Sequence, residues 1–163
     1  MHEQNIIPEI ALVGMSHKTA PVELRECFSL YGEEGRKVLA RLGKSGIREA
    51  VYVATCNRVE VYFAATDVIR GTQSVMSVLE ELSPGQSDRF DGALYRKYGR
   101  DAVRHLLYVS ASLDSMVIGE NEILGQLKKS YSMAVQAEMT GVVMNRLFHC
   151  AFRAAKKVRS ETD

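Results

Sequence analysis

Cys56 is the side chain of this sequence best suited to nucleophilic chemistry. It stands with Asn57 and Arg58 in a short junction between two apolar runs, residues 49–55 and 59–65. A junction of this length favours a hairpin, which would bring the thiol and the guanidinium together at its tip. The thiolate is the reactive form of cysteine, and a nearby cation favours it. The alternative is a buried cysteine at a strand end that acts as a small hydrophobic residue, and the local pattern leaves both interpretations open.

Histidine supplies the second candidate group, because a neutral imidazole accepts a proton from a thiol or from water near neutral pH. His105 falls in an expected helix, where an isolated histidine is equally consistent with a surface position. His17, after the first expected strand, is open in the same way. Cys27 and Cys150 fall on the apolar stripes of expected helices, so we expect both in the core.

A run of small and polar residues, 113–121, precedes an expected apolar helix. Glu122 and Gln126 are four residues apart and share a face of that helix, whereas Glu120 does not share it and is expected in the loop or the first turn. The loop could converge on the Cys56 hairpin. A helix–loop–helix junction with a capping residue explains the same pattern.

The elements that would position these groups follow from the hydrophobic periodicity. Strands are expected at 10–16, 49–55, 59–65 and 93–98. Helices are expected at 24–42 in two pieces, at 67–82, from 100 onward, at 121–139 and at 142–159. The order strand–helix–strand–strand–helix–strand predicts an α+β fold, a ferredoxin-like split βαβ sandwich whose antiparallel sheet has helices on one face, followed by a helical segment.

Composition excludes several classes of protein. With 46% hydrophobic and 25% charged residues and a formal net charge of +1, the chain is neither disordered nor fibrous, and a nucleic acid would have to be bound by a local surface or with the help of another domain. No apolar run could span a bilayer and the N-terminus is unlike a signal peptide, so we expect a cytoplasmic protein. Three widely spaced cysteines argue against disulfides and zinc, and the lack of a Gly-x-Gly pair argues against a dinucleotide-binding loop.

Three motifs together resemble the family of glutamyl-tRNA reductases. They are Gly-Met-Ser-His-Lys-Thr-Ala-Pro from residue 14, Ala-Thr-Cys-Asn-Arg-Val-Glu-Val-Tyr from residue 54, and Leu-Asp-Ser-Met-Val-Ile-Gly-Glu-Asn-Glu from residue 113. The resemblance implies a catalytic domain that ends before the NADPH-binding and dimerisation domains. Its expected divisions are a ferredoxin-like catalytic core at 1–99, a helical part that completes the substrate site at 100–140, and the start of a connecting helix at 141–163.

The resemblance also implies a reaction. In this family a cysteine, here Cys56, attacks the aminoacyl ester of glutamyl-tRNA(Glu), releases the tRNA and forms a thioester. NADPH on the missing domain then reduces the thioester to glutamate-1-semialdehyde, in the first step of tetrapyrrole (5-aminolevulinate, porphyrin and haem) biosynthesis. No metal is implied. The implied partners are a second copy of the full-length protein and glutamate-1-semialdehyde aminomutase.

The family's site positions carry over to this sequence residue by residue. Arg58 would bind the glutamate side-chain carboxylate through its planar fork, Glu120 would bind the substrate ammonium group, and His105 would serve proton transfer or transition-state polarisation. The substrate-binding residues implied are Thr55, Cys56, Asn57, Arg58, Ser115, Glu120, Asn121, Glu122 and Gln126. The chain departs from the usual family pattern at Ala54 (serine is common), Ser112 (glycine), Asn121 (proline) and Glu122 (glutamine).

Two functions of different classes therefore compete. As a reductase fragment, the chain would lack reductase activity and show at most esterase activity on glutamyl-tRNA through Cys56. As a non-catalytic ferredoxin-like module, it would bind RNA or protein, and Cys56 would be unreactive. The rate of thiol alkylation at neutral pH separates the two.

Overall fold

The computed structural model describes residues 7–112 and 122–162. Its strands are β1 (Glu9–Ser16), β2 (Glu49–Ala54), β3 (Arg58–Ala65) and β4 (Tyr95–Tyr98). Its helices are α1 (Val22–Glu26), α2 (Glu33–Lys44), α3 (Val68–Leu82), α4 (Ser87–Ala93), α5 (Arg100–Ser110), α6 (Glu122–Gln136) and α7 (Val142–Thr162). The short helix α4 is the one element that the hydrophobic pattern did not predict.

The four strands form one sheet in the order β2-β3-β1-β4, and each neighbouring pair is antiparallel. This order, with helices in both crossovers, is that of the ferredoxin-like split βαβ sandwich. The predicted fold class is confirmed. β1 and β3 occupy the centre of the sheet, so residues of β3 have neighbours on both sides as well as above and below.

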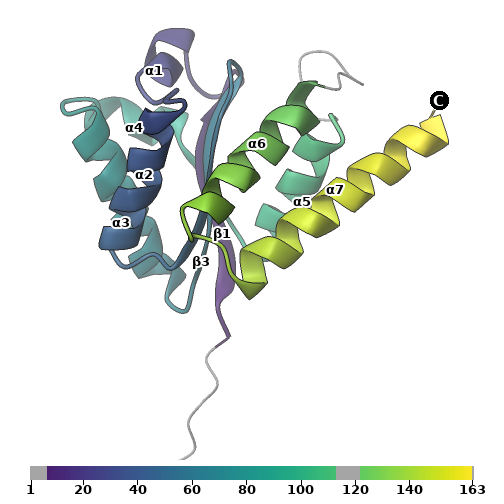
Figure 1. Cartoon of the computed structure of the whole chain (residues 1–163). Helices are drawn as coiled ribbons and strands as arrows, with labels where there is room; N and C mark the ends of the chain where they lie inside the picture. Colours follow the sequence, from purple (N-terminus) through teal and green to yellow (C-terminus); the bar gives the residue numbers. More distant parts are fainter. Residues whose placement is uncertain (1–6, 113–121, 163) are drawn as a thin grey trace, which may run out of the picture.

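Helices cover both faces of the sheet (Figure 1). α2 and α3 pack on one face, with α1 and α4 beside them, as the split βαβ pattern predicts. The second face is covered by α5, α6 and α7, which contact strands β1 to β4 between them. Because of this second layer, β3 is buried on both sides, and a charged residue at its centre has no access to water.

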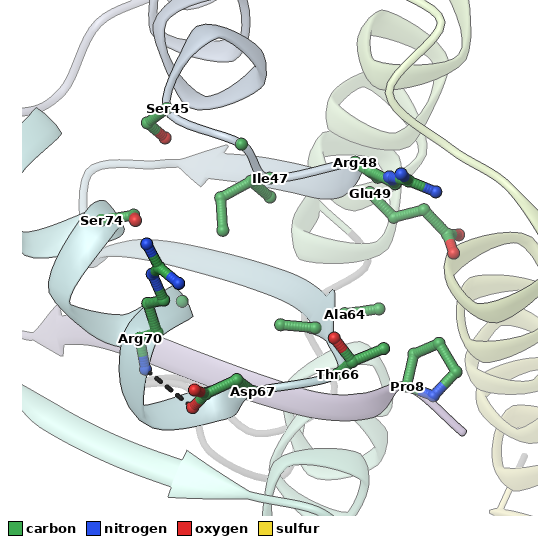
Figure 2. A pocket seen from close by; sticks show the side chains of 13 residues that line it. Pro8, Ser45, Ile47, Arg48, Glu49, Ala64, Thr66, Asp67, Arg70 and Ser74 are labelled. Atoms are coloured by element: carbon green, nitrogen blue, oxygen red, sulfur yellow. Dashed lines mark hydrogen bonds between the residues drawn. The ribbon is translucent and has the colours of Figure 1, made fainter. Parts of the chain in front are cut away.

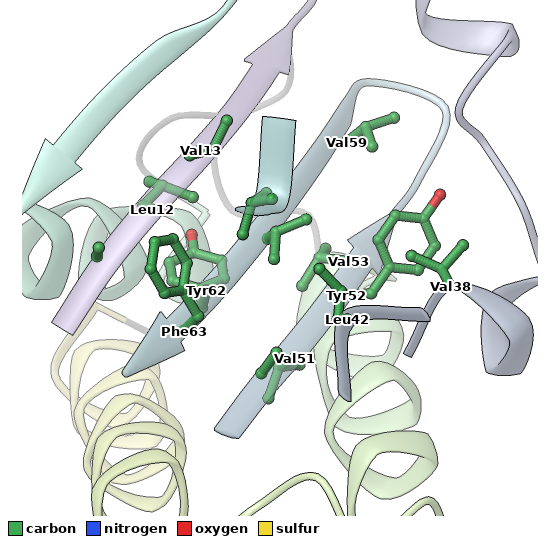
Figure 3. Close-up of a cluster of buried hydrophobic side chains, with 14 of the residues drawn as sticks. Leu12, Val13, Val38, Leu42, Val51, Tyr52, Val53, Val59, Tyr62 and Phe63 are labelled. Atoms are coloured by element: carbon green, nitrogen blue, oxygen red, sulfur yellow. The ribbon is translucent and has the colours of Figure 1, made fainter. Parts of the chain in front are cut away.

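The core is continuous through the sheet. Apolar side chains of the strands alternate between the two faces of the sheet, so they pack on α2 and α3 on one face and on the second helical layer on the other, as Tyr62 does against Phe148 of α7. Figure 3 shows part of this core: Leu12, Val13, Val38, Leu42, Val51, Tyr52, Val53, Val59, Tyr62 and Phe63. Each of these side chains is almost fully buried, which stabilises the fold by about 1.5–3 kcal/mol for a Val, Leu or Phe. The sheet that carries the Cys56 hairpin is therefore a rigid base.

Glu49 joins the sheet to the last helix. Its Oε1 accepts hydrogen bonds from the backbone N–H groups of Gly141 (2.7 Å) and Met144 (2.8 Å), at the start of α7. The N–H of Ala50 donates to the carbonyl oxygen of Met139 at 2.9 Å. A carboxylate at a helix N-terminus satisfies free N–H groups and is favoured by the helix dipole. These contacts fix where α7 begins relative to β2.

The helices contradict the expected core position of Cys150 and meet that of Cys27 in part. Cys150 is exposed, so the prediction of a core position was wrong: α7 buries Met144, Phe148 and Ala151, and Cys150 lies on its outward side. Cys27 is half-buried, packs against the core, and donates from its Sγ to the carbonyl oxygen of Glu23 at 3.3 Å.

Ser112, where glycine is common in the family, has a backbone conformation that explains this preference for glycine. Its φ of 63° lies in the left-handed region, where a glycine has no steric strain. A glycine is therefore the residue best suited to this backbone position. In the described ranges, no helix is long and apolar enough to cross a membrane.

Candidate active site

Cys56 lies at the exposed tip of the β2–β3 hairpin. The tip is closed by Thr55, whose N–H donates to the carbonyl oxygen of Arg58 at 2.9 Å. The Oγ1 of Thr55 accepts from the N–H groups of Asn57 and Arg58, each at 3.2 Å. The N–H of His17 donates to the carbonyl oxygen of Asn57 at 2.8 Å. Hydrogen bonds within the tip and from the neighbouring loop therefore fix the backbone that carries the thiol.

A small cleft of about 30 Å³ lies at this tip. The hairpin contributes one wall, and α5 and the first turn of α6 contribute the other. The lining residues are Thr55, Cys56, Asn57, Arg58, Val109, Glu122, Ile123 and Gln126. Six of the residues expected in the substrate site thus share one cleft. Ser115, Glu120 and Asn121 lie outside the described residues.

Arg58 lines the cleft from below rather than at its rim. The sequence indicated a guanidinium at the hairpin tip, yet Arg58 is the first residue of β3 and its side chain is only 2% exposed. Its Nη1 lies 3.6 Å from Glu60 Oε2. A buried guanidinium needs an anion nearby, because an isolated buried charge is strongly disfavoured. The position of Arg58 therefore depends on Glu60.

Glu60 is the centre of a buried polar cluster that connects β3, β4 and α5. Its Oε1 accepts from the hydroxyl of Tyr62 at 2.9 Å, and its Oε2 accepts from the hydroxyl of Tyr95 at 2.5 Å. The Nε2 of His105 also contacts Oε2. With Arg58, four groups surround one fully buried carboxylate. We call these five residues the Glu60 cluster.

The Glu60 cluster keeps its carboxylate ionised. Burial raises the pKa of Glu60, but His105, Arg58 and the Tyr95 hydroxyl outweigh burial, so the pKa lies below its ordinary value. Burial and the negative charge of Glu60 raise the pKa of Tyr62 well above its ordinary value, so this hydroxyl stays protonated and donates. An anion held by neighbouring donors and cations is a stable charge on which to orient other groups.

His105 meets Glu60, and it is absent from the residues that line the cleft. Its ring also lies against Tyr95, with centroids 5.4 Å apart and an interplanar angle of 50°. The route from His105 to the cleft runs through Glu60 and Arg58. This arrangement suits a group that orients the site through a hydrogen-bonded chain.

Sequence reasoning missed Glu60, Tyr62 and Tyr95. The available signal was an acid in the middle of an apolar strand, with a tyrosine two residues later on the same side. Such an acid faces water or a buried partner, and three C-terminal amphipathic helices provide a cover for the second face of the sheet. Nothing in the sequence around Tyr95 indicates that its hydroxyl donates a hydrogen bond to Glu60.

A larger pocket of about 660 Å³ opens at the other end of the sheet, between the end of α2 and the start of α3 (Figure 2). Its charged lining residues are Arg48, Glu49, Asp67 and Arg70, and no cysteine or histidine lines it. Asp67 caps α3 by accepting from the Arg70 N–H at 3.1 Å. This pocket therefore offers neither a thiol nucleophile nor an imidazole base. The described residues also contain no group of three or more His, Cys, Asp or Glu side chains placed to hold a metal ion.

Comparison with known proteins decides the family. Residues 13–162 match the family model described as glutamyl-tRNAGlu reductase, N-terminal domain. The chain belongs to this family. The glutamyl-tRNA reductase of Desulfatibacillum aliphaticivorans is 45% identical over 157 residues, which cover 94% of this chain and 36% of that protein. The enzyme of Syntrophus aciditrophicus is 46% identical over 159 residues, which cover 94% and 37%.

A solved member of the family has the same architecture. The glutamyl-tRNA reductase from Methanopyrus kandleri aligns with a TM-score of 0.74 and 31% identity, over 94% of this chain and 35% of that one. The chain thus spans little more than a third of the glutamyl-tRNA reductases it matches. The resemblance seen in the three motifs is confirmed.

Proposed function

We propose that this chain performs the acyl-transfer half-reaction of a glutamyl-tRNA reductase. Cys56 Sγ attacks the carbonyl carbon of the glutamyl ester, and a C–S bond replaces the C–O bond to the terminal ribose. The thiol proton leaves with the ribose hydroxyl, so the products are a glutamyl thioester and free tRNA. The observation that carries the proposal is an exposed cysteine on a fixed hairpin tip, above a buried arginine, in a chain of this family.

Arg58 is proposed to select the substrate through its side-chain carboxylate. A guanidinium has five N–H donors in a rigid fork, so it can contact Glu60 on one side and a second carboxylate on the other. Arg58 both lines the cleft and lies 3.6 Å from Glu60, which supports this dual contact. Thr55, Asn57, Glu122 and Gln126 line the same cleft as further proposed substrate contacts. The roles of Ser115, Glu120 and Asn121 stay predictions.

His105 is proposed as a positioning residue. Its hydrogen bond to the ionised Glu60 fixes the carboxylate, which in turn fixes Arg58 under the cleft. This chain of contacts favours polarisation of the transition state over direct proton transfer between the imidazole and Cys56. A cleft in which this network fixes Arg58 would hold the glutamyl carbonyl next to the thiol, which is how orientation lowers the barrier.

The reduction step is proposed to need parts of a longer protein. A Rossmann-type NADPH site has a phosphate-binding turn between a parallel strand and a helix, and the described sheet is antiparallel throughout. The residues present therefore do not fit this cofactor, and we derive no step through it. In the longer protein we propose NADPH-dependent formation of glutamate-1-semialdehyde for tetrapyrrole synthesis, in a homodimer that passes its product to the aminomutase.

The test of this function is deacylation of charged tRNA. The chain is incubated with tRNA that carries a radiolabelled glutamyl group, and release of that group from the tRNA is followed against a Cys56→Ser variant and a Cys150→Ser control. We expect release above the spontaneous rate in the unchanged chain and in the Cys150→Ser control, and none above that rate in Cys56→Ser. Equal release by all three proteins would contradict the proposal and favour the non-catalytic binding module.

A further inference from the structure

The near-zero net charge of this chain conceals an uneven distribution over the two helical layers. Helices α1 to α4, on one face of the sheet, contain seven lysines and arginines and eight acids. Helices α5 to α7, on the other face, contain nine lysines and arginines and three acids. The second layer is also the one that forms a wall of the Cys56 cleft. An anion that approaches the cleft is therefore attracted from the side of α5 to α7.

α5 presents part of this charge as a stripe. Arg100, Arg104 and Tyr108 follow one another at intervals of four residues and are all exposed, and Tyr108 is 50% exposed. The stripe extends for about 12 Å along the helix axis. Asp101 is the one acid on the outward side of this helix. In the described part of the chain, neither arginine of the stripe takes part in an ion pair.

The stripe ends beside the cleft. Tyr108 is followed by Val109, which lines the cleft. The next residue, Ser110, donates from its Oγ to the carbonyl oxygen of Ala151 in α7 at 3.4 Å. α5 and α7 therefore lie side by side at this end of the layer.

α7, which packs against α5, adds two exposed cations to the same helical layer. Arg153 and Lys157 are both exposed and are four residues apart on α7, within two turns of Ala151. We define the α5–α7 basic face as Arg100, Arg104, Tyr108, Arg153 and Lys157. It combines four cations with one exposed aromatic ring, Tyr108, which directly precedes the cleft residue Val109.

We propose that the α5–α7 basic face binds the acceptor arm of the substrate tRNA. This inference rests on the proposed function, because it takes the RNA of glutamyl-tRNA as the ligand. Arginine and lysine side chains neutralise phosphates, and an exposed aromatic ring stacks on unpaired bases. Arg100, Arg104, Arg153 and Lys157 contact phosphates, and Tyr108 stacks on a base of the single-stranded 3′ end. The terminal ribose then reaches the cleft where Cys56 lies.

The helices of the opposite layer, α1 to α4, differ from the α5–α7 basic face because some of their cations are paired with acids. On α2, Arg36 and Lys37 are already paired with Glu33 and Glu34, one turn earlier. Cations that are paired with neighbouring acids attract a polyanion less strongly. Among the described helices, the excess of cations over acids thus lies in the layer of α5 to α7, which forms a wall of the cleft where the reaction is proposed.

The experiment compares two double variants of this chain with the same change in charge. Arg100→Gln with Arg104→Gln alters the basic face, and Arg41→Gln with Lys44→Gln alters exposed cations at the end of α2. Binding of fluorescent, uncharged tRNA is measured by anisotropy over a series of salt concentrations. Acylation of Cys56 by a small glutamyl thioester, which carries no RNA, is measured in parallel.

We expect the Arg100 and Arg104 double variant to bind tRNA about tenfold more weakly, with a slope of log K against log salt that is lower by about 1.5. Its reaction with the small thioester stays within about twofold of the unchanged chain. The α2 double variant should match the unchanged chain in both assays. Tyr108→Ala should weaken binding of an acceptor minihelix that has its unpaired 3′ end, and should leave binding of a blunt minihelix unchanged.

Equal loss of tRNA binding in both double variants, or no loss in either, would overturn the assignment of this face. Failure of the proposed function is a separate result, because it appears as an absence of Cys56 acylation by the small thioester. A chain that binds tRNA through α5 without acylating Cys56 supports the surface and contradicts the reaction.

Discussion

Gly14 and Glu60 lie directly opposite each other in the β1–β3 ladder, and the side chain of Glu60 occupies the space that a Cβ on Gly14 would need. A Cβ at this position would lie 2.8 Å from Glu60 Cγ and 2.9 Å from the carbonyl oxygen of Val59. The absence of a side chain on β1 is thus a condition for the buried carboxylate on β3. The first motif, which begins at Gly14, and the second motif, which contains Cys56, are linked by this contact.

Gly14→Ala is expected to displace Glu60 and to lower both stability and activity. An overpacked core position costs about 1–3 kcal/mol, and the backbone oxygen of Val59 cannot move away easily. Urea unfolding gives the free energy, and glutamyl-tRNA deacylation gives the activity. The control is Gly92→Ala in α4, where nothing lies within 4 Å of the added carbon. If Gly14→Ala behaves like this control, the contact with Glu60 has no consequence.

Glu60→Gln is expected to change the pH dependence of stability. Because the pKa of Glu60 is lower in the folded protein than its ordinary value of 4.5, this carboxylate stabilises the fold above that value. The contribution is lost as the pH falls through the lowered pKa. The difference in unfolding free energy between the two proteins should therefore shrink between about pH 5 and pH 2. A difference that stays constant over this range would mean that Glu60 is not ionised in the native state.

The two tyrosines of the Glu60 cluster form a matched pair of hydroxyls. Tyr95 donates to Oε2, the oxygen shared with Arg58 and His105, and Tyr62 donates to Oε1. Removing either hydroxyl should cost about 1–3 kcal/mol of stability, as for a hydrogen bond to a charged group. Tyr95→Phe should also lower the Cys56-dependent rate about tenfold, and Tyr62→Phe should lower it by less than about threefold. Equal rates in the two variants would mean that the hydrogen bonds to Oε1 and Oε2 of Glu60 matter equally for the reaction, which would contradict this prediction.

The three cysteines are expected to differ in alkylation. Cys56 and Cys150 are exposed and Cys27 is half-buried, so iodoacetamide should label the first two in the native protein faster than Cys27. Peptide mapping identifies each site. Replacing Cys150 by serine should leave deacylation unchanged. Rapid native labelling of Cys27, or protection of Cys56, would contradict the burial described above.

Sequence reasoning predicts the parts of this protein that depend on local pattern. The strands, the long helices and the hairpin that exposes Cys56 follow from periodicity of 2 or 3.6 residues and from short junctions. Helix α4 was missed because its seven residues contain only Phe90 as a large apolar side chain. The burial of Arg58 was missed because it depends on α5 and α6, far along the chain.

The Glu60 cluster shows most clearly what local pattern does not contain. Its members come from β3, β4 and α5, and the contact between Glu60 and His105 joins residues 45 apart. Alternation along β3 assigns Glu60 and Tyr62 to one face. It does not say whether that face meets water or a second helical layer. The position of Cys150 was predicted wrongly for a related reason. Cys150 borders the apolar stripe of α7 next to the buried Ala151, and the pattern does not show how much of that border the neighbouring helices cover.

The central claim is tested most directly by trapping the acyl group on the protein. The chain is mixed with glutamyl-tRNA, quenched in acid within seconds, digested at low pH and mapped by mass spectrometry. We predict a glutamyl adduct on the peptide that contains Cys56, released by neutral hydroxylamine and absent from the Cys56→Ser variant. A full deacylation signal with no adduct on this peptide, or an adduct on Cys27 or Cys150, would contradict the account.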